Sequence, residues 1–129
     1  MSEIALTLTL LPSTYAVCRL GSDGGVPEWV MSGSFFSVTR TVDELSVVCE
    51  QSAVPGGVLC EGGWRCLKVR GPLDFGLTGI LASLAVPLAE AGISIFAVST
   101  YDTDYIMVKA ADLEGAVAVL SGSGHTITL

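Results

Sequence analysis

The order of apolar patterns in the second half of the chain restricts its fold more than any other feature. Residues Trp64–Val69 alternate between the two faces of a β-strand. The glycine-rich loop Gly71–Gly79 follows and leads into apolar residues at helical spacing: Ile80, Leu81, Leu84, Leu88 and Ala91. Gly92 favours a helix end after them. The spacing therefore predicts a strand, a loop and a helix in succession.

A second strand, a third strand, a helix and a last strand follow in the remaining residues. The strands are predicted at Ile93–Ser99, Tyr105–Lys109 and His125–Leu129, and the helix has the apolar stripe Leu113, Ala116, Val117 and Leu120. The resulting order, β-α-β-β-α-β, is the ferredoxin-like arrangement. Pro87, inside the first helix, cannot donate a hydrogen bond to the carbonyl of Ser83, which predicts a kink or a local break.

The first half of the chain repeats this pattern in a weaker form when it is shifted by sixty residues. The shift places Phe36–Thr39 on Phe96–Ser99, Leu45–Val48 on Tyr105–Val108, and Val42–Glu44 on Asp102–Asp104. One register accounts for all of these matches. We therefore predict an α+β fold with two ferredoxin-like units in tandem, residues 1–61 and 62–129.

The first of these units is expected to be degenerate, with shortened helices. Ala16–Gly25 contains a turn where the second unit has a long helix, and Pro27–Met31 suffices for one helical turn. Ser52–Gly63 is too rich in glycine and proline for a second helix. Pro12–Leu20, at the place of the glycine-rich loop, has no glycine, so a second equivalent site is not expected. Because Trp64–Val69 is assigned to the second unit, the first is short of a strand or borrows one.

Composition and charge exclude several classes of function. Half of the residues are hydrophobic and the net charge is -7, which does not suit binding to a phosphate backbone. An acidic protein of this kind favours small cationic or zwitterionic partners. The N-terminus lacks the basic segment of a signal peptide, and the most apolar stretch is interrupted by Pro87, Glu90 and Gly92. We expect a cytoplasmic protein that binds neither nucleic acid nor membrane.

The cysteine and histidine content argues against metal and catalytic chemistry. None of Cys18, Cys49, Cys60 and Cys66 forms a C-x-x-C pair, and His125 is the single histidine. The four thiols are expected to be reduced and buried. Because no nucleophile–base pair is visible, we predict no enzymatic activity and no cofactor.

Two polar features remain as candidates for a site, and each has several interpretations. The loop Gly71–Ile80 leads into a helix N-terminus, which favours a carboxylate, although an ordinary tight turn also explains it. Asp102 and Asp104 suit turn formation, a divalent cation held together with Asp74, or the binding of an amino or guanidinium group. A free amino acid carries both charges and matches the loop and the aspartates together.

Three stretches resemble the ACT domain: Gly71–Phe75, Pro87–Ser94 and Val98–Tyr105. More closely, they are similar to small bacterial tandem-ACT proteins related to the regulatory regions of aspartate kinases and to the cytosolic arginine sensors of animals. The resemblance implies a non-catalytic regulatory module that binds a free amino acid at an interface between ACT units. It also implies a homodimer and a protein effector outside this chain.

The resemblance further implies which residues bind the ligand. From the loop these are Leu73, Asp74, Phe75, Gly76, Leu77, Thr78, Gly79 and Ile80, and from the hairpin they are Thr100, Tyr101 and Asp104. Asp104 is expected to hold the cationic end of the ligand, and Asp102 to form the turn. Leu77 stands where the animal sensor has an acidic residue, so arginine itself is not implied. The alternatives are an interaction module without a ligand and a metal-binding hairpin.

Overall fold

The computed structural model describes residues 4–74 and 78–129, which form two compact units. The larger unit consists of Met1–Pro12 together with Arg65–Leu129, and the smaller unit is Ser13–Trp64. Residues 4–12 therefore pack with the second half of the chain. The division predicted at residues 61 and 62 concerns the sequence repeat and stays a prediction.

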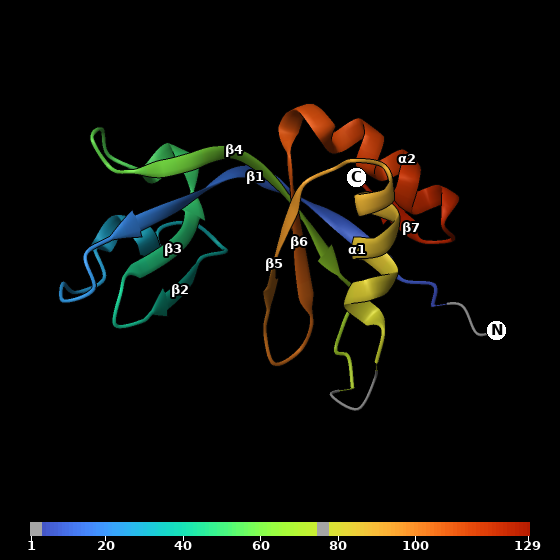
Figure 1. Ribbon diagram of the computed structural model, residues 1–129, viewed down its shortest axis with the longest axis horizontal. Coiled ribbons are helices and arrows are strands. Elements are labelled where there is room, and N and C mark those ends of the chain that lie inside the picture. The colour runs from blue at the N-terminus through green and yellow to red at the C-terminus, as the bar shows by residue number, and fades with distance from the viewer. Residues whose placement is uncertain (1–3, 75–77) are drawn as a thin grey trace. The chain divides into compact units, whose positions relative to one another are not determined.

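The larger unit follows the element order predicted for the second half of the chain (Figure 1). Its elements are β4 (Cys60–Val69), α1 (Ile80–Glu90), β5 (Ile95–Ser99), β6 (Asp104–Lys109), the 3-10 turn η3 (Ala110–Asp112), α2 (Leu113–Gly122) and β7 (Thr126–Thr128). Strands and helices thus alternate as in a ferredoxin-like fold. The local patterns of apolar residues were sufficient to predict these strands and helices, but not the 3-10 turn η3.

The strand β1 (Thr7–Leu20) enters the sheet of the larger unit between β7 and β4. The strand order there is β7-β1-β4-β6-β5, and β7 runs parallel to β1, with Thr7 opposite Thr126 and Thr9 opposite Thr128. Both β1 and β4 contribute residues to both units. The smaller unit therefore does not lack a strand. The prediction of a loop at Pro12–Leu20 was wrong, since this stretch is the second part of β1. It is rich in residues that favour strands.

The core of the larger unit lies between one face of this sheet and the two helices, which lie side by side in Figure 1. Its fully buried side chains are Leu8, Leu67, Val69, Leu84, Leu88, Ile106, Val108, Ala116 and Leu120. They come from β1, β4, β6, α1 and α2. Burial of this apolar surface fixes the helices against the strands that carry the candidate site.

The helix α1 is continuous from Ile80 to Glu90, although Pro87 lies inside it. The predicted local break is therefore wrong, and a kink at Pro87 stays a prediction. His125 supplies the physical reason for the continuous helix. Its ring atom Nε2 lies 3.0 Å from the carbonyl oxygen of Ser83, the acceptor to which Pro87 has no N–H to donate. The backbone N–H of Leu6 donates to Nδ1 of the same ring at 3.1 Å. Since that amide can only donate, the neutral ring carries its proton on Nε2 and donates it to Ser83.

The smaller unit is built around a second, smaller core. Its elements are the second part of β1, the 3-10 turn η1 (Glu28–Met31), β2 (Ser37–Arg40), β3 (Leu45–Glu50), the 3-10 turn η2 (Gln51–Ala53) and the start of β4. Its strands lie in the order β2-β3-β1-β4, and the buried residues of this core cluster are Ala16, Cys18, Val30, Leu45, Val47 and Cys49. The single helical turn predicted at Pro27–Met31 is η1.

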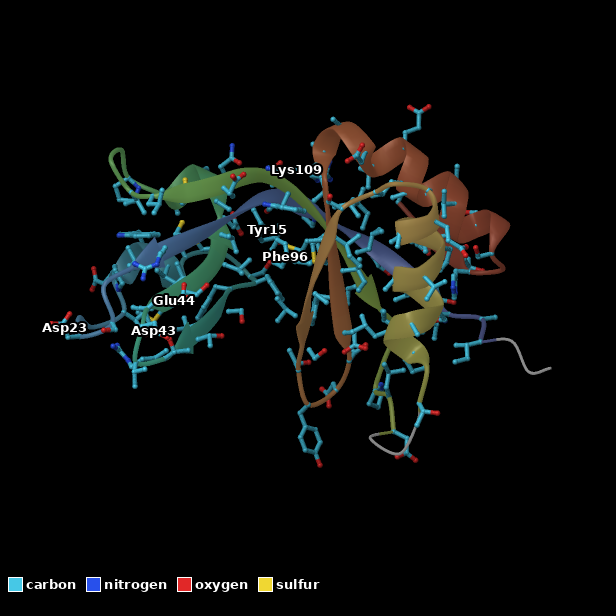
Figure 2. The ribbon with its side chains drawn as sticks, viewed as in Figure 1. Tyr15, Asp23, Asp43, Glu44, Phe96 and Lys109 are labelled. Carbon is cyan, nitrogen blue, oxygen red and sulfur yellow. The ribbon has the colours of Figure 1, made fainter. Side chains whose placement is uncertain are left out.

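The turns of the smaller unit are fixed by arginine side chains. The guanidinium of Arg40 donates to the carbonyls of Ser22 and Gly24, and that of Arg19 donates to the carbonyl of Asp43 at 2.9 Å. Figure 2 shows Asp23 in the first of these turns and Asp43 with Glu44 in the other. Charge-assisted bonds of this kind order the loops at this end of the unit.

The hairpins β2–β3 and β5–β6 have the same turn. Equivalent residues of the two hairpins lie 59 positions apart in the sequence, one fewer than the predicted shift of sixty. The Thr41 N–H donates to the Glu44 carbonyl at 2.9 Å, and the Thr100 N–H donates to the Thr103 carbonyl at 2.8 Å. The 3-10 turns Gln51–Ala53 and Ala110–Asp112 keep this offset. The predicted shift of sixty was therefore wrong for this region. The consequence is that Leu45, and not Glu44, takes the place of Asp104.

Candidate functional site

The loop after β4 and the β5–β6 turn are joined by short backbone and hydroxyl contacts. The Leu73 N–H donates to the Asp102 carbonyl at 2.6 Å, and the Thr103 hydroxyl donates to the Val69 carbonyl at 2.7 Å. A Cβ atom on Gly71 would lie 2.9 Å from the Asp102 carbonyl oxygen, so only glycine allows this approach. The two polar features singled out in the sequence are thus adjacent.

Two threonines, rather than an aspartate side chain, close the hairpin turn. The Thr100 hydroxyl donates to the Thr103 carbonyl at 3.1 Å, and the same oxygen lies 3.3 Å from the Thr103 N–H. Thr103 is 4% exposed. The turn role expected for Asp102 therefore belongs to Thr100, while Asp102 contributes its backbone carbonyl to the loop contact. Short hydroxyl side chains form such turns readily.

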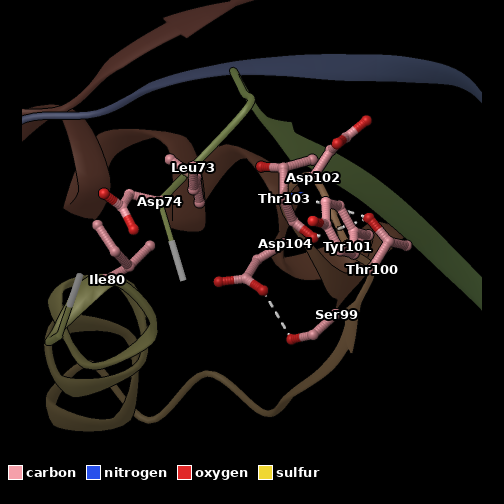
Figure 3. A pocket seen from close by; sticks show the side chains of 9 residues that line it. All are labelled: Leu73, Asp74, Ile80, Ser99, Thr100, Tyr101, Asp102, Thr103 and Asp104. Atoms are coloured by element: carbon pink, nitrogen blue, oxygen red, sulfur yellow. Dashed lines mark hydrogen bonds between the residues drawn. The ribbon is translucent and has the colours of Figure 1, made fainter. Parts of the chain in front are cut away.

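The loop and the hairpin enclose a pocket of about 230 Å³ within the larger unit (Figure 3). Its lining residues are Leu73, Asp74, Ile80, Ser99, Thr100, Tyr101, Asp102, Thr103 and Asp104. Ile80 is the first residue of α1, so the helix begins at the pocket. Several lining side chains, including Asp74 and Tyr101, are exposed, and the pocket is therefore open to solvent.

The side chains that line the pocket give it a negative charge. Asp74, Asp102 and Asp104 line it, and the described lining residues include no lysine, arginine or histidine. Asp104 is half-buried, and its Oδ1 accepts a hydrogen bond from the Ser99 hydroxyl at 2.6 Å, drawn as a dashed line in Figure 3. Asp102 is exposed. This arrangement suits a cationic group beside Asp104, because a partly buried carboxylate attracts a positive charge more strongly than an exposed one.

The described carboxylates of this pocket are not grouped at the spacing of a metal centre. Among residues 4–74 and 78–129, no group of three histidine, cysteine, aspartate or glutamate side chains lies close enough to hold an ion. A calcium site requires six to eight oxygen ligands. The geometry of this pocket therefore gives no support to the metal-binding alternative.

Only some of the predicted ligand-binding residues line the pocket. Those that line the pocket are Leu73, Asp74, Ile80, Thr100, Tyr101 and Asp104. Thr78 and Gly79 are exposed and are not among the lining residues, and Phe75, Gly76 and Leu77 lie outside the described residues. Their role as ligand contacts stays a prediction.

The predicted ligand-binding residues do not include three residues that line the pocket: Ser99, Thr103 and Asp102, which was assigned to the turn. Thr100, at the first position of the turn, is a signal that could have identified it, because Thr41 makes the same hydrogen bonds to Glu44 in the other hairpin. In the smaller unit, Leu45 lies at the place of Asp104 and is 1% exposed within the core. That hairpin therefore has an apolar residue where the larger unit has its half-buried carboxylate.

The cysteines depart from expectation in one respect. Cys18, Cys49 and Cys66 are buried, as predicted, but Cys60 is exposed. Burial raises the pKa of the Cys66 thiol to about 12, since the charged thiolate would lose its hydration.

No helix in the described part of the chain is long and apolar enough to cross a membrane.

Comparison with known proteins identifies two regions of the chain. A family model described as the ACT domain matches residues 59–122, and a second model, described as an N-terminal domain, matches residues 13–57. A cytosolic arginine sensor for mTORC1, subunit 1, from Bos taurus is 32% identical over 98 residues. This match covers 67% of the present chain but 30% of the sensor, so the chain spans about a third of that relative.

Solved structures extend the similarity over the whole chain. A crystal structure of a protein from Agrobacterium tumefaciens has a TM-score of 0.93 and 40% sequence identity, over 98% of this chain and 95% of that one. The regulatory subunit of aspartate kinase from Thermus thermophilus has a TM-score of 0.61 at 11% identity, over 90% and 96% of the two chains, and shares the fold. The present chain therefore belongs to the same family as the Agrobacterium protein, and its residues 59–122 match the model of the ACT domain.

Proposed function

We propose that the chain is a non-catalytic regulatory module that binds a free amino acid in the pocket between the Gly71–Ile80 loop and the β5–β6 hairpin. The observation that carries the proposal is the half-buried Asp104 carboxylate, fixed by Ser99 in an acidic pocket at the start of α1. The similarity to an arginine sensor supports an amino acid as the class of ligand.

The two charged ends of an amino acid have different partners in this pocket. An ammonium or guanidinium group lies beside Asp104, with Asp74 and Asp102 contributing to the negative potential. The ligand carboxylate accepts hydrogen bonds from the backbone at the N-terminus of α1, where the helix dipole favours an anion. A volume of about 230 Å³ suits a small metabolite rather than a larger cofactor.

A second copy of the chain completes the pocket in this proposal. Asp74, Thr100, Tyr101 and Asp102 are exposed, so a ligand bound to one copy keeps one side in water. A homodimer that covers this side binds the ligand more tightly, and the ligand in turn stabilises the dimer, because the coupling between two binding events is reciprocal. The protein effector recognises this ligand-bound state. In this proposal the module is cytoplasmic. The β2–β3 and β5–β6 hairpins belong to two ACT units in tandem.

A thermal-shift screen of the full chain against the free amino acids tests the proposal. Binding at a hundredfold excess over Kd stabilises the folded state by about 2.7 kcal/mol, which raises the unfolding temperature measurably. Asp104→Asn keeps the shape of the side chain and removes its charge, so we expect it to abolish the shift. Asp23→Asn, in an exposed turn of the smaller unit, is the matched control and keeps the response.

Light scattering on the same samples measures the oligomeric state with and without the ligand. A dimer that forms or tightens with the ligand supports the shared pocket. An equal thermal shift in Asp104→Asn and in the unmodified chain contradicts the role of Asp104. A flat response to every amino acid, with a stable dimer, favours an interaction module that has no ligand.

A further inference from the structure

Three of the four cysteines gather on one face of the smaller unit. The register between β1 and β3 places Ala16 opposite Cys49 and Cys18 opposite Val47, so Cys18 and Cys49 are diagonal neighbours on the same face. Both belong to the buried core of this unit. The third cysteine, Cys60, is the first residue of β4, the strand on the other side of β1.

Hydrogen bonding between β1 and β4 sets Cys60 directly opposite Cys18. The Arg19 N–H donates to the Leu59 carbonyl at 3.0 Å, which makes Arg19 and Leu59 an opposed pair of antiparallel strands. The next pair along the two strands is Cys18 with Cys60, and it is a non-hydrogen-bonded pair. In such pairs the Cα atoms are about 4.5 Å apart, within the range of about 4.4–6.8 Å that a disulfide spans.

The two thiols differ in their access to solvent but share one pocket. Cys60 is exposed, whereas Cys18 is 1% exposed. Both line a pocket of about 200 Å³, together with Arg19, Glu44 and other residues of the smaller unit. A small oxidant in this pocket reaches Cys60 directly and has Cys18 beside it. Cys49 is not among the lining residues.

The electrostatics of the cluster agree with this proximity. Burial, and after it the neighbouring thiols of Cys49 and Cys60, raise the pKa of Cys18 to about 12. Burial also raises the pKa of Cys49. Because the thiolate is the reactive form, the two buried cysteines are poor first nucleophiles, and the exposed Cys60 is the thiol that meets the oxidant.

We propose that Cys18 and Cys60 are a redox-active dithiol, which a hydroperoxide converts into a disulfide between β1 and β4. The Cys60 sulfur attacks the O–O bond of the hydroperoxide, which breaks as an S–O bond forms and an alcohol or water leaves, giving a sulfenic acid. The Cys18 sulfur then attacks this sulfenic sulfur. The S–S bond forms, the S–O bond breaks, and the oxygen leaves as water with the proton of Cys18. The two thiols lose two electrons, which the hydroperoxide gains.

Peptide mapping of the intact chain after treatment with hydrogen peroxide tests this assignment. Oxidised and untreated samples are alkylated and then digested with trypsin and a glutamate-specific protease. Cleavage at Arg19, Glu50 and Glu61 places Cys18, Cys49 and Cys60 in three separate peptides. We expect a mass loss of about 2 Da, a cross-linked peptide that contains Cys18 and Cys60, and reversal by dithiothreitol.

Two variants separate this disulfide from other oxidation products. Cys60→Ser alters an exposed side chain and is expected to abolish the cross-link, whereas Cys66→Ala, at a buried position of the larger unit, is the control and keeps it. A cross-link between Cys18 and Cys49, a disulfide between two copies through Cys60, or oxidation of Cys60 to a sulfinic acid without any cross-link would overturn the proposal.

Discussion

The contact between His125 and the carbonyl of Ser83 leads to a quantitative prediction about stability. His125 is 5% exposed and is bonded on both ring nitrogens, to Ser83 at 3.0 Å and to Leu6 at 3.1 Å. The substitution His125→Ala removes both partners at once. Each polar group left unsatisfied costs about 1–3 kcal/mol, so the two groups together predict a loss of roughly 2–6 kcal/mol in the free energy of unfolding.

The substitution Pro87→Ala tests why His125 matters. An alanine at this position restores the backbone N–H, which donates to the Ser83 carbonyl as in any α-helix. In that background the loss of His125 leaves only the Leu6 N–H without its partner. We therefore expect His125→Ala to cost roughly 1–3 kcal/mol less in the Pro87→Ala variant than in the unmodified chain.

Urea unfolding of the four chains in this double-mutant cycle measures the coupling. Circular dichroism follows the helices, and the midpoints are compared where the slopes agree. Pro55→Ala, at an exposed position of the smaller unit, is the control for the general effect of proline on the unfolded chain. If the losses at His125 and Pro87 add to within about 0.5 kcal/mol, His125 does not replace the missing helix bond and the reasoning is refuted.

Three further predictions use the same unfolding assay. Leu84→Ala, in the core of the larger unit, should cost about 2–5 kcal/mol, and Leu81→Ala, more exposed on the same helix, should cost much less; equal losses would contradict the core assignment. Thr103→Val removes the hydroxyl that donates to Val69 and should cost about 1–2 kcal/mol, with the exposed Thr128→Val as a control that changes little. Burial raises the pKa of Cys66 to about 12 from 9.0, so the unfolded state releases its proton first and stability should fall as the pH rises above 9.0; an unchanged slope in Cys66→Ala would exclude this thiol as a cause.

The site could be predicted in part because its two components are local. The glycine-rich loop and the hairpin are each recognisable within about ten residues of sequence, and the structure places them side by side through the contact of Leu73 with Asp102. The assignment of the turn to Asp102 failed because an aspartate and a threonine pair compete for the same local hydrogen bonds. Only the backbone geometry shows that Thr100 and Thr103 close the turn.

The sequence by itself determined the order of the helices and strands from β4 to β7, although β4 begins at Cys60 and not at the predicted Trp64. Apolar periodicity depends on neighbours two to four residues apart, and it predicted both helices and their flanking strands. It also showed that Pro87 deprives the Ser83 carbonyl of its partner. What the sequence could not show is which distant group would supply the missing bond.

The tertiary structure alone decided the pairings between distant segments. His125 reaches Ser83 across 42 residues and Leu6 across 119, and β7 pairs with β1 from the other end of the chain. Cys18 meets Cys60 for the same reason, since β1 lies beside β4. A strand presents the same pattern of side chains whichever neighbour it pairs with, so the choice of neighbour depends on the packing of the whole core and not on local sequence.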